Sequence, residues 1–102
     1  MKKENISCWI YSGDPDYVSQ KDNDNFYSEI ICYRQLKDDP SLKAISTIYW
    51  VPQSRVYFGV VFRPEKDSVM EVCYRLEGNT FESVRLKLDL KLVEMNFKVD
   101  IF

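Results

Sequence analysis

One polar stretch of the chain carries four carboxylates at close spacing, from Asp14, Asp16, Asp22 and Asp24. Carboxylate oxygens bind hard cations such as Ca²⁺, and they also attract basic protein surfaces. The spacing does not fit an EF-hand, because Phe26 stands where a third oxygen ligand is needed and no glycine turn or closing glutamate follows. A solvated, turn-rich loop is the simpler interpretation. If this acidic loop has a function, we expect it to dock on a basic protein and not to hold a metal.

The chain has no histidine, and its cysteines, Cys8, Cys32 and Cys73, lie far apart with no C-x-x-C pair. Histidine is the commonest general base and transition-metal ligand, so its absence removes imidazole-dependent catalysis and a structural zinc site. Three scattered cysteines do not suggest a disulfide framework, and we expect reduced, mostly buried thiols in a cytoplasmic protein. The three glycines are isolated and form no phosphate loop. We therefore predict a non-enzymatic protein with no catalytic residues and no cofactor.

The composition is typical of one globular domain covering residues 1–102. The chain is 45% hydrophobic and 15% aromatic, which supplies enough apolar surface for a core. The net charge is −2, with five basic and eight acidic side chains in residues 1–40, so no global field draws the chain to nucleic acid. No window approaches the roughly 18 apolar residues of a membrane span, and we expect no membrane association.

The first half of the chain is predicted to begin with a strand from Ile6 to Tyr11, which ends at the turn residues 12–15. A helix is favoured from Asn25 to about Lys37, although the β-prone residues in this segment leave a strand open. Two apolar segments, 44–51 and 56–62, are the clearest pair of strands, and residues 52–55 are short enough to join them as a hairpin.

The second half is predicted to contain a helix and a long strand. Apolar residues between Val69 and Leu76 follow helical spacing after Pro64, and Gly78 offers a stop. Residues 84–92 alternate as in a strand, and the alternation shifts by one residue at Val93, which indicates a bend into a C-terminal extension over 93–101. The order βαββαβ predicts a ferredoxin-like α+β fold, an antiparallel sheet with two helices on one face and a C-terminal strand extension.

In such a fold the sheet face without helices would carry aromatic and basic side chains. Alternation along the strands places Trp9, Tyr11 and Tyr57 on this face, with Arg85, Lys87 and Lys91 around them. A large exposed apolar patch usually marks an interface. Its occupant is the C-terminal segment, a second copy of the chain in a homodimer, another protein, or single-stranded RNA.

One segment supports the RNA alternative. Residues 55–62, RVYFGVVF, resemble the RNP1 octamer of RNA-recognition motif domains in the basic first, aromatic third, aliphatic sixth and aromatic eighth positions. Val56 stands in place of the motif's glycine, and Phe58-Gly59 inverts its small-then-aromatic order. The resemblance implies that bases stack on Trp9 and Tyr57 while phosphates meet Arg85, Lys87 and Lys91.

These observations lead to one main functional hypothesis. The chain is a small protein-binding module, acting as an inhibitor, an immunity-type protein or a regulator of another protein. Its binding residues are those of the acidic loop and the aromatic face, namely Asp14, Asp16, Asp22, Asp24, Trp9, Tyr11 and Tyr57. Single-stranded RNA binding is the first alternative, and a small-molecule sensor or enzyme with a pocket at a dimer interface is the second.

Overall fold

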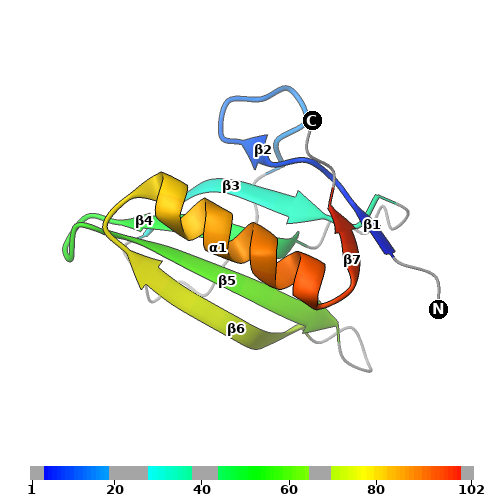
Figure 1. The fold of residues 1–102 in the computed structure, drawn as a ribbon. Helices are drawn as coiled ribbons and strands as arrows, with labels where there is room; N and C mark the ends of the chain where they lie inside the picture. Colours follow the sequence, from blue (N-terminus) through cyan, green and yellow to red (C-terminus); the bar gives the residue numbers. More distant parts are fainter. Residues whose placement is uncertain (1–3, 19–27, 38–43, 65–69, 100–102) are drawn as a thin grey trace.

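A five-stranded antiparallel sheet forms the body of the fold (Figure 1). The computed structural model describes residues 4–18, 28–37, 44–64 and 70–99. The strands stand in the order β2-β3-β4-β5-β6. Their bounds are Ile10–Tyr11 for β2, Glu29–Gln35 for β3, Ala44–Val51 for β4, Val56–Pro64 for β5 and Met70–Gly78 for β6. Helix α1, Phe81–Glu94, lies across one face of this sheet.

A second, two-stranded sheet joins the two ends of the described chain. Strand β1, Glu4–Ile6, runs parallel to β7, Phe97–Val99, with Ile6 opposite Val99. The segment after β1 is also tied to the end of β3, because the Ser7 amide donates to the Gln35 carbonyl at 2.8 Å. The small sheet therefore places β1 and β7 beside the C-terminal end of α1, as Figure 1 shows.

The predicted hairpin of residues 44–62 is confirmed. Strands β4 and β5 pair antiparallel from Val51 opposite Val56 to Ser46 opposite Val61. The turn between them places Arg55 in the left-handed region at φ 54°, and the Arg55 amide donates to the Val51 carbonyl at 2.8 Å. The sequence is suited to this arrangement because both strands are rich in β-branched and aromatic residues and the connection is short.

The predicted ferredoxin-like fold is wrong, because both predicted helices contain strands. Residues 29–35 form β3, the alternative left open for the segment from Asn25 to Lys37, whose residues 25–27 lie outside the described residues. Residues 70–78 form β6, in which Tyr74 and Leu76 are half-buried while Arg75 and Glu77 are exposed. That alternation has a period of two, and it outweighs the helical spacing of the apolar residues in the same segment. The predicted strand of residues 6–11 is divided into β1 and β2.

The predicted strand of residues 84–92 is also wrong, because this segment lies within α1. Thr80 caps the helix, and its hydroxyl accepts a hydrogen bond from the Ser83 amide at 3.3 Å. The residues that follow are mostly Leu, Lys, Arg and Glu, which have high helix propensity. Asn96, at φ 73°, ends the helix and leads into β7, so only 97–99 of the predicted extension 93–101 form a described strand. The fold is thus α+β with more sheet than helix.

Close packing of α1 on β5 builds the main core. Val84, Leu88 and Leu92 recur every four residues on one side of the helix and are completely buried. The helix approaches Gly59 of β5 so closely that a Cβ atom there would lie 2.7 Å from Leu88 Cδ1 and 2.8 Å from Val84 Cγ1. Only glycine allows this approach, and it sets the distance of α1 from the sheet. No helix in the described ranges is long and apolar enough to span a membrane.

We expect Gly59→Ala to destabilise the protein by about 1–3 kcal/mol, because the added methyl group overpacks the contact with Val84 and Leu88. Leu88→Ala alone is expected to cost about 2–5 kcal/mol through the cavity that it leaves. In the double variant the new methyl group fills part of that cavity, so the cost should be smaller than the sum of the two single costs. Urea denaturation of the four proteins measures this coupling, and additive costs would show that the helix does not pack on Gly59 as described.

Candidate functional site

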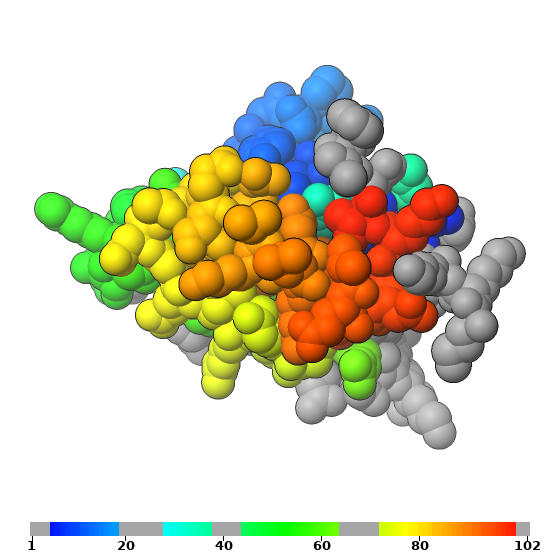
Figure 2. Space-filling model, in the orientation of Figure 1, coloured from blue at the N-terminus to red at the C-terminus, as the bar shows by residue number. Residues whose placement is uncertain are grey.

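A groove lies between the N-terminal segment of residues 8–11, helix α1 and strand β7. Its volume is about 640 Å³. The lining residues are Cys8, Trp9, Tyr11, Arg34, Arg85, Leu86, Asp89, Leu90, Val93, Phe97, Lys98 and Val99. In Figure 2 the surface of α1, in orange, borders the N-terminal segment, in blue above it, and β7, in red to its right. We call this feature the α1 groove.

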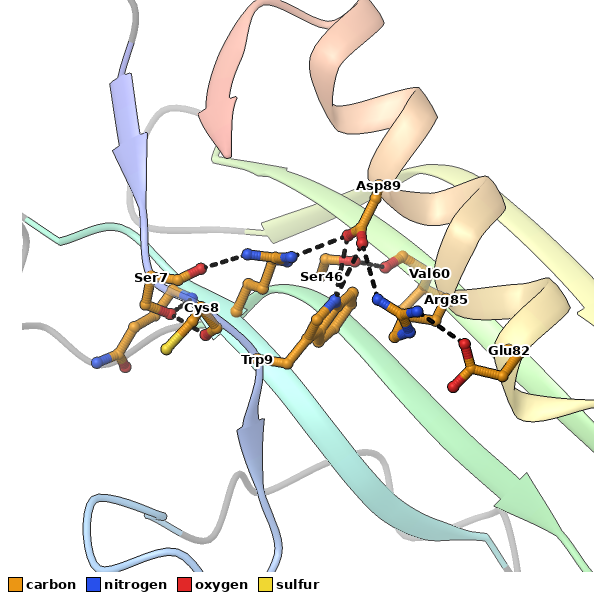
Figure 3. A network of polar contacts seen from close by, with 10 residues as sticks. Ser7, Cys8, Trp9, Ser46, Val60, Glu82, Arg85 and Asp89 are labelled. Carbon is orange, nitrogen blue, oxygen red and sulfur yellow. Dashed lines mark hydrogen bonds and ion pairs between the residues drawn. The ribbon is translucent and has the colours of Figure 1, made fainter. Parts of the chain in front are cut away.

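The carboxylate of Asp89 is the centre of the polar part of the α1 groove. The indole Nε1 of Trp9 donates to Asp89 Oδ1 at 3.1 Å, and Arg34 Nη2 lies 3.1 Å from the same oxygen. Arg85 Nη1 lies 3.7 Å from Asp89 Oδ2. Figure 3 shows Trp9 and Arg85 pointing toward this carboxylate, Trp9 from the N-terminal segment and Arg85 from the preceding turn of α1. One acidic side chain thus connects the helix to the chain before β2.

Arg34 extends these contacts to β3 and the N-terminal segment. Its side chain is buried, and Nη1 donates to the Ser7 carbonyl at 2.7 Å. The guanidinium group also lies over the Trp9 ring, 4.7 Å from the ring centroid. The carboxylate, the carbonyl and the aromatic face compensate this guanidinium in part for the loss of water, although its Nε is buried without a hydrogen-bond acceptor among the described residues. These contacts hold the wall of the α1 groove in place.

Burial raises the pKa of Asp89, and the nearby Arg34, Trp9 and Arg85 act in the opposite direction. Both carboxylate oxygens are already engaged by these donors, which suits a structural role better than proton transfer to a substrate. Burial also raises the pKa of the Cys32 thiol to about 12, so this cysteine is not a thiolate nucleophile. No cluster of three Cys, Asp or Glu side chains that could hold a metal ion occurs in the described part of the chain.

The outward side of α1 is apolar as well. Leu86, Leu90 and Val93 are 57, 62 and 56% exposed, and their spacing of i, i+4 and i+7 places them along one side of the helix. We call them the outer stripe. All three also line the α1 groove, so the apolar surface continues from the helix into the groove. When a helix carries apolar side chains on two sides, another element or another molecule usually packs against each side.

The structure describes two of the four predicted residues of the acidic loop. Asp14 and Asp16 are exposed, whereas Asp22 and Asp24 lie outside the described residues. Asp14 belongs to the predicted turn, since its Oδ2 accepts a hydrogen bond from the Tyr11 amide at 2.8 Å and Gly13 has φ 105°. The carboxylate of Asp14 therefore has a local role in the turn.

The open sheet face predicted from the sequence does not form, because α1 covers the face that carries Tyr57 and Gly59. Trp9 is only 8% exposed and is held by Asp89, while Tyr11 is exposed and lines the α1 groove. Tyr57 is half-buried, with its ring centroid 4.8 Å from that of Trp50. The structure thus brings only Tyr11 to an accessible position at the groove.

The three predicted phosphate-binding residues lie on the helix and not on a strand. Arg85 is paired with Glu82 at 2.7 Å, and Lys91 Nζ lies 5.0 Å from the centroid of the Tyr74 ring. Lys87 is exposed on α1. Arg85, Lys87 and Lys91 therefore do not surround Trp9 and Tyr57 on one surface, and the proposed stacking of RNA bases between them has no support in this geometry.

Trp9, Tyr11 and Arg85, which line the α1 groove, were singled out from the sequence, but other residues that define the site were missed. Arg34 and Asp89 were not singled out, because their ion pair joins distant parts of the chain. The outer stripe was missed because residues 84–92 were interpreted as a strand. One available signal was Thr80, which precedes fourteen residues of mostly high helix propensity and is a favoured N-cap.

The raised pKa of Asp89 predicts a dependence of stability on pH. Because the native value exceeds the ordinary value of 3.8, the folded protein binds more protons than the unfolded chain while this group titrates. The contribution of Asp89 to the free energy of unfolding is full at pH values below its pKa in the unfolded chain. This contribution is lost as the pH rises through its pKa in the folded protein. Asp89→Asn keeps an acceptor for Trp9 but cannot ionise. Relative to this variant, the free energy of unfolding of the wild type should fall as pH rises.

Urea denaturation of both proteins between about pH 3 and about pH 7 measures this difference. Other carboxylates titrate in both proteins, so the difference reports mainly on Asp89. A wild type that gains stability over Asp89→Asn as pH rises would contradict the prediction and show that the two arginines outweigh burial.

Comparisons of the chain with protein-family models, with curated proteins and with solved structures find no match. The function must therefore be inferred from the α1 groove and the outer stripe themselves.

Proposed function

We propose that the chain is a non-enzymatic protein-binding module and that its contact surface is the outer stripe with the adjoining α1 groove. The observation that carries this proposal is that α1 has apolar side chains on both its buried side and its exposed side. Val84, Leu88 and Leu92 are buried in the protein's own core, whereas the outer stripe is more than half exposed. Apolar side chains that recur along an exposed helix are suited to a second protein surface.

The surroundings of the outer stripe also suit a protein interface. Tyr11 and Arg85 lie at the α1 groove, and these two residue types are enriched among residues that contribute strongly to binding. The wall behind them is held by the contacts of Asp89 with Trp9 and Arg34, so the surface is pre-organised. A rigid surface loses little conformational entropy when it binds a partner.

The mode of action that fits a small binding module is stoichiometric. Such a protein would act as an inhibitor, an immunity-type protein or a regulator by covering part of its partner. We place this activity in the cytoplasm, since the three cysteines are free and a reducing compartment keeps them so. The acidic loop is a secondary contact in this proposal, through the exposed carboxylates of Asp14 and Asp16.

A photo-reactive amino acid at position 90 tests the proposal. With p-benzoylphenylalanine in place of Leu90, irradiation of cells that make the protein should produce a covalent adduct with another polypeptide chain, identified by mass spectrometry. The same amino acid at Val72 is the matched control, because Val72 is 46% exposed but lies on β6, away from the α1 groove.

The expected result is an adduct from position 90 and none from position 72. Circular dichroism of both labelled proteins checks that the fold is kept. If neither position, or only position 72, forms an adduct, the outer stripe is not a protein contact and the proposal fails.

A further inference from the structure

We infer that the partner seated on the outer stripe is a second copy of this chain, packed with its α1 antiparallel to the first. This inference rests on the proposed function and names the partner of the same surface. It is carried by the self-complementary pattern of apolar and charged residues on the exposed side of α1.

The apolar part of the pattern matches a helix–helix seam. Leu86, Leu90 and Val93 have the alternating four- and three-residue spacing of coiled-coil core positions. In an antiparallel pair centred near Leu90, Leu90 meets its own copy, and Leu86 of each chain lies opposite Val93 of the other. Each copy thereby covers the exposed apolar surface of the other.

The charged part of the pattern selects the antiparallel orientation. Lys87 and Glu94 are seven residues apart, so they lie on the same flank of the outer stripe, and both are exposed. Antiparallel pairing about Leu90 places Lys87 of each chain opposite Glu94 of the other, which gives two ion pairs related by symmetry. A parallel pair would instead bring Asp89 of one chain toward Glu94 of the other, where like charges repel.

Both charges are available for this contact. Glu94 lies 3.5 Å from Lys91 of its own helix, but its side chain is mostly exposed and has a second oxygen to offer. Lys87 makes no ion pair with any described residue. The partner helix thus supplies a carboxylate to a lysine that pairs with none among the described residues.

The oligomeric state of the full chain tests this inference. Sedimentation equilibrium of the wild type should show a monomer–dimer equilibrium, and Leu90→Asp should be monomeric because it buries two carboxylates at the centre of the seam. Lys87→Glu should weaken the dimer by about tenfold, since it replaces two attractive pairs with two repulsive ones. Glu94→Lys should have a similar effect.

The decisive protein is the double variant Lys87→Glu with Glu94→Lys, which should restore the dimer to near the wild-type dissociation constant. Val72→Asp is the control and should leave the dimer unchanged, since Val72 lies on β6. A double variant as weak as the single ones, or a dimer that Val72→Asp dissociates and Leu90→Asp does not, would overturn the inference.

The same experiment separates this inference from the proposed function. A wild type that remains monomeric at about 1 mM overturns self-association. If the photo-reactive residue at position 90 then captures a different protein, the proposed function stands with another partner. If it captures nothing, both fail.

Discussion

The contact of α1 with Gly59 is the constraint on which the rest of the structure depends. Because no Cβ atom separates them, Val84 and Leu88 rest directly on β5, and this fixes both the depth and the rotation of the helix. The rotation directs Asp89 toward the N-terminal segment and leaves Leu86 and Leu90 on the outside. A glycine in the middle of a strand thus determines which helical side chains form the core and which form the α1 groove.

The polar contacts of Asp89 follow from that rotation. Once the carboxylate faces the segment before β2, Trp9 and Arg34 can both reach it, and the segment is held against the helix although its strands are short. Burial raises the pKa of Asp89 even with these donors present, so they do not fully compensate the ionised carboxylate for the water that it loses. The same contacts therefore hold both the N-terminal segment and the wall of the α1 groove against the helix.

The secondary structure was predicted correctly only where the residue pattern fits one kind of element. The β4–β5 hairpin was predicted because both strands are β-branched or aromatic and their connection is short. Residues 84–92 misled the interpretation, since a row of apolar residues at every second position also contains residues four apart, which is a helical spacing. The same ambiguity reversed the interpretation of β6. Tyr11 was identified at the site, whereas the pairing of Arg34 with Asp89 requires knowledge of the tertiary structure.

The ambiguity at residues 84–92 also explains the apolar outer surface. In a helix, residues two apart point in nearly opposite directions, so an alternating pattern necessarily places half of its apolar side chains inward and half outward. Val84, Leu88 and Leu92 are buried in the core, whereas Leu86 and Leu90 are exposed outside it. The exposed, apolar side chains of Leu86 and Leu90 therefore support the proposed protein contact on this side of α1.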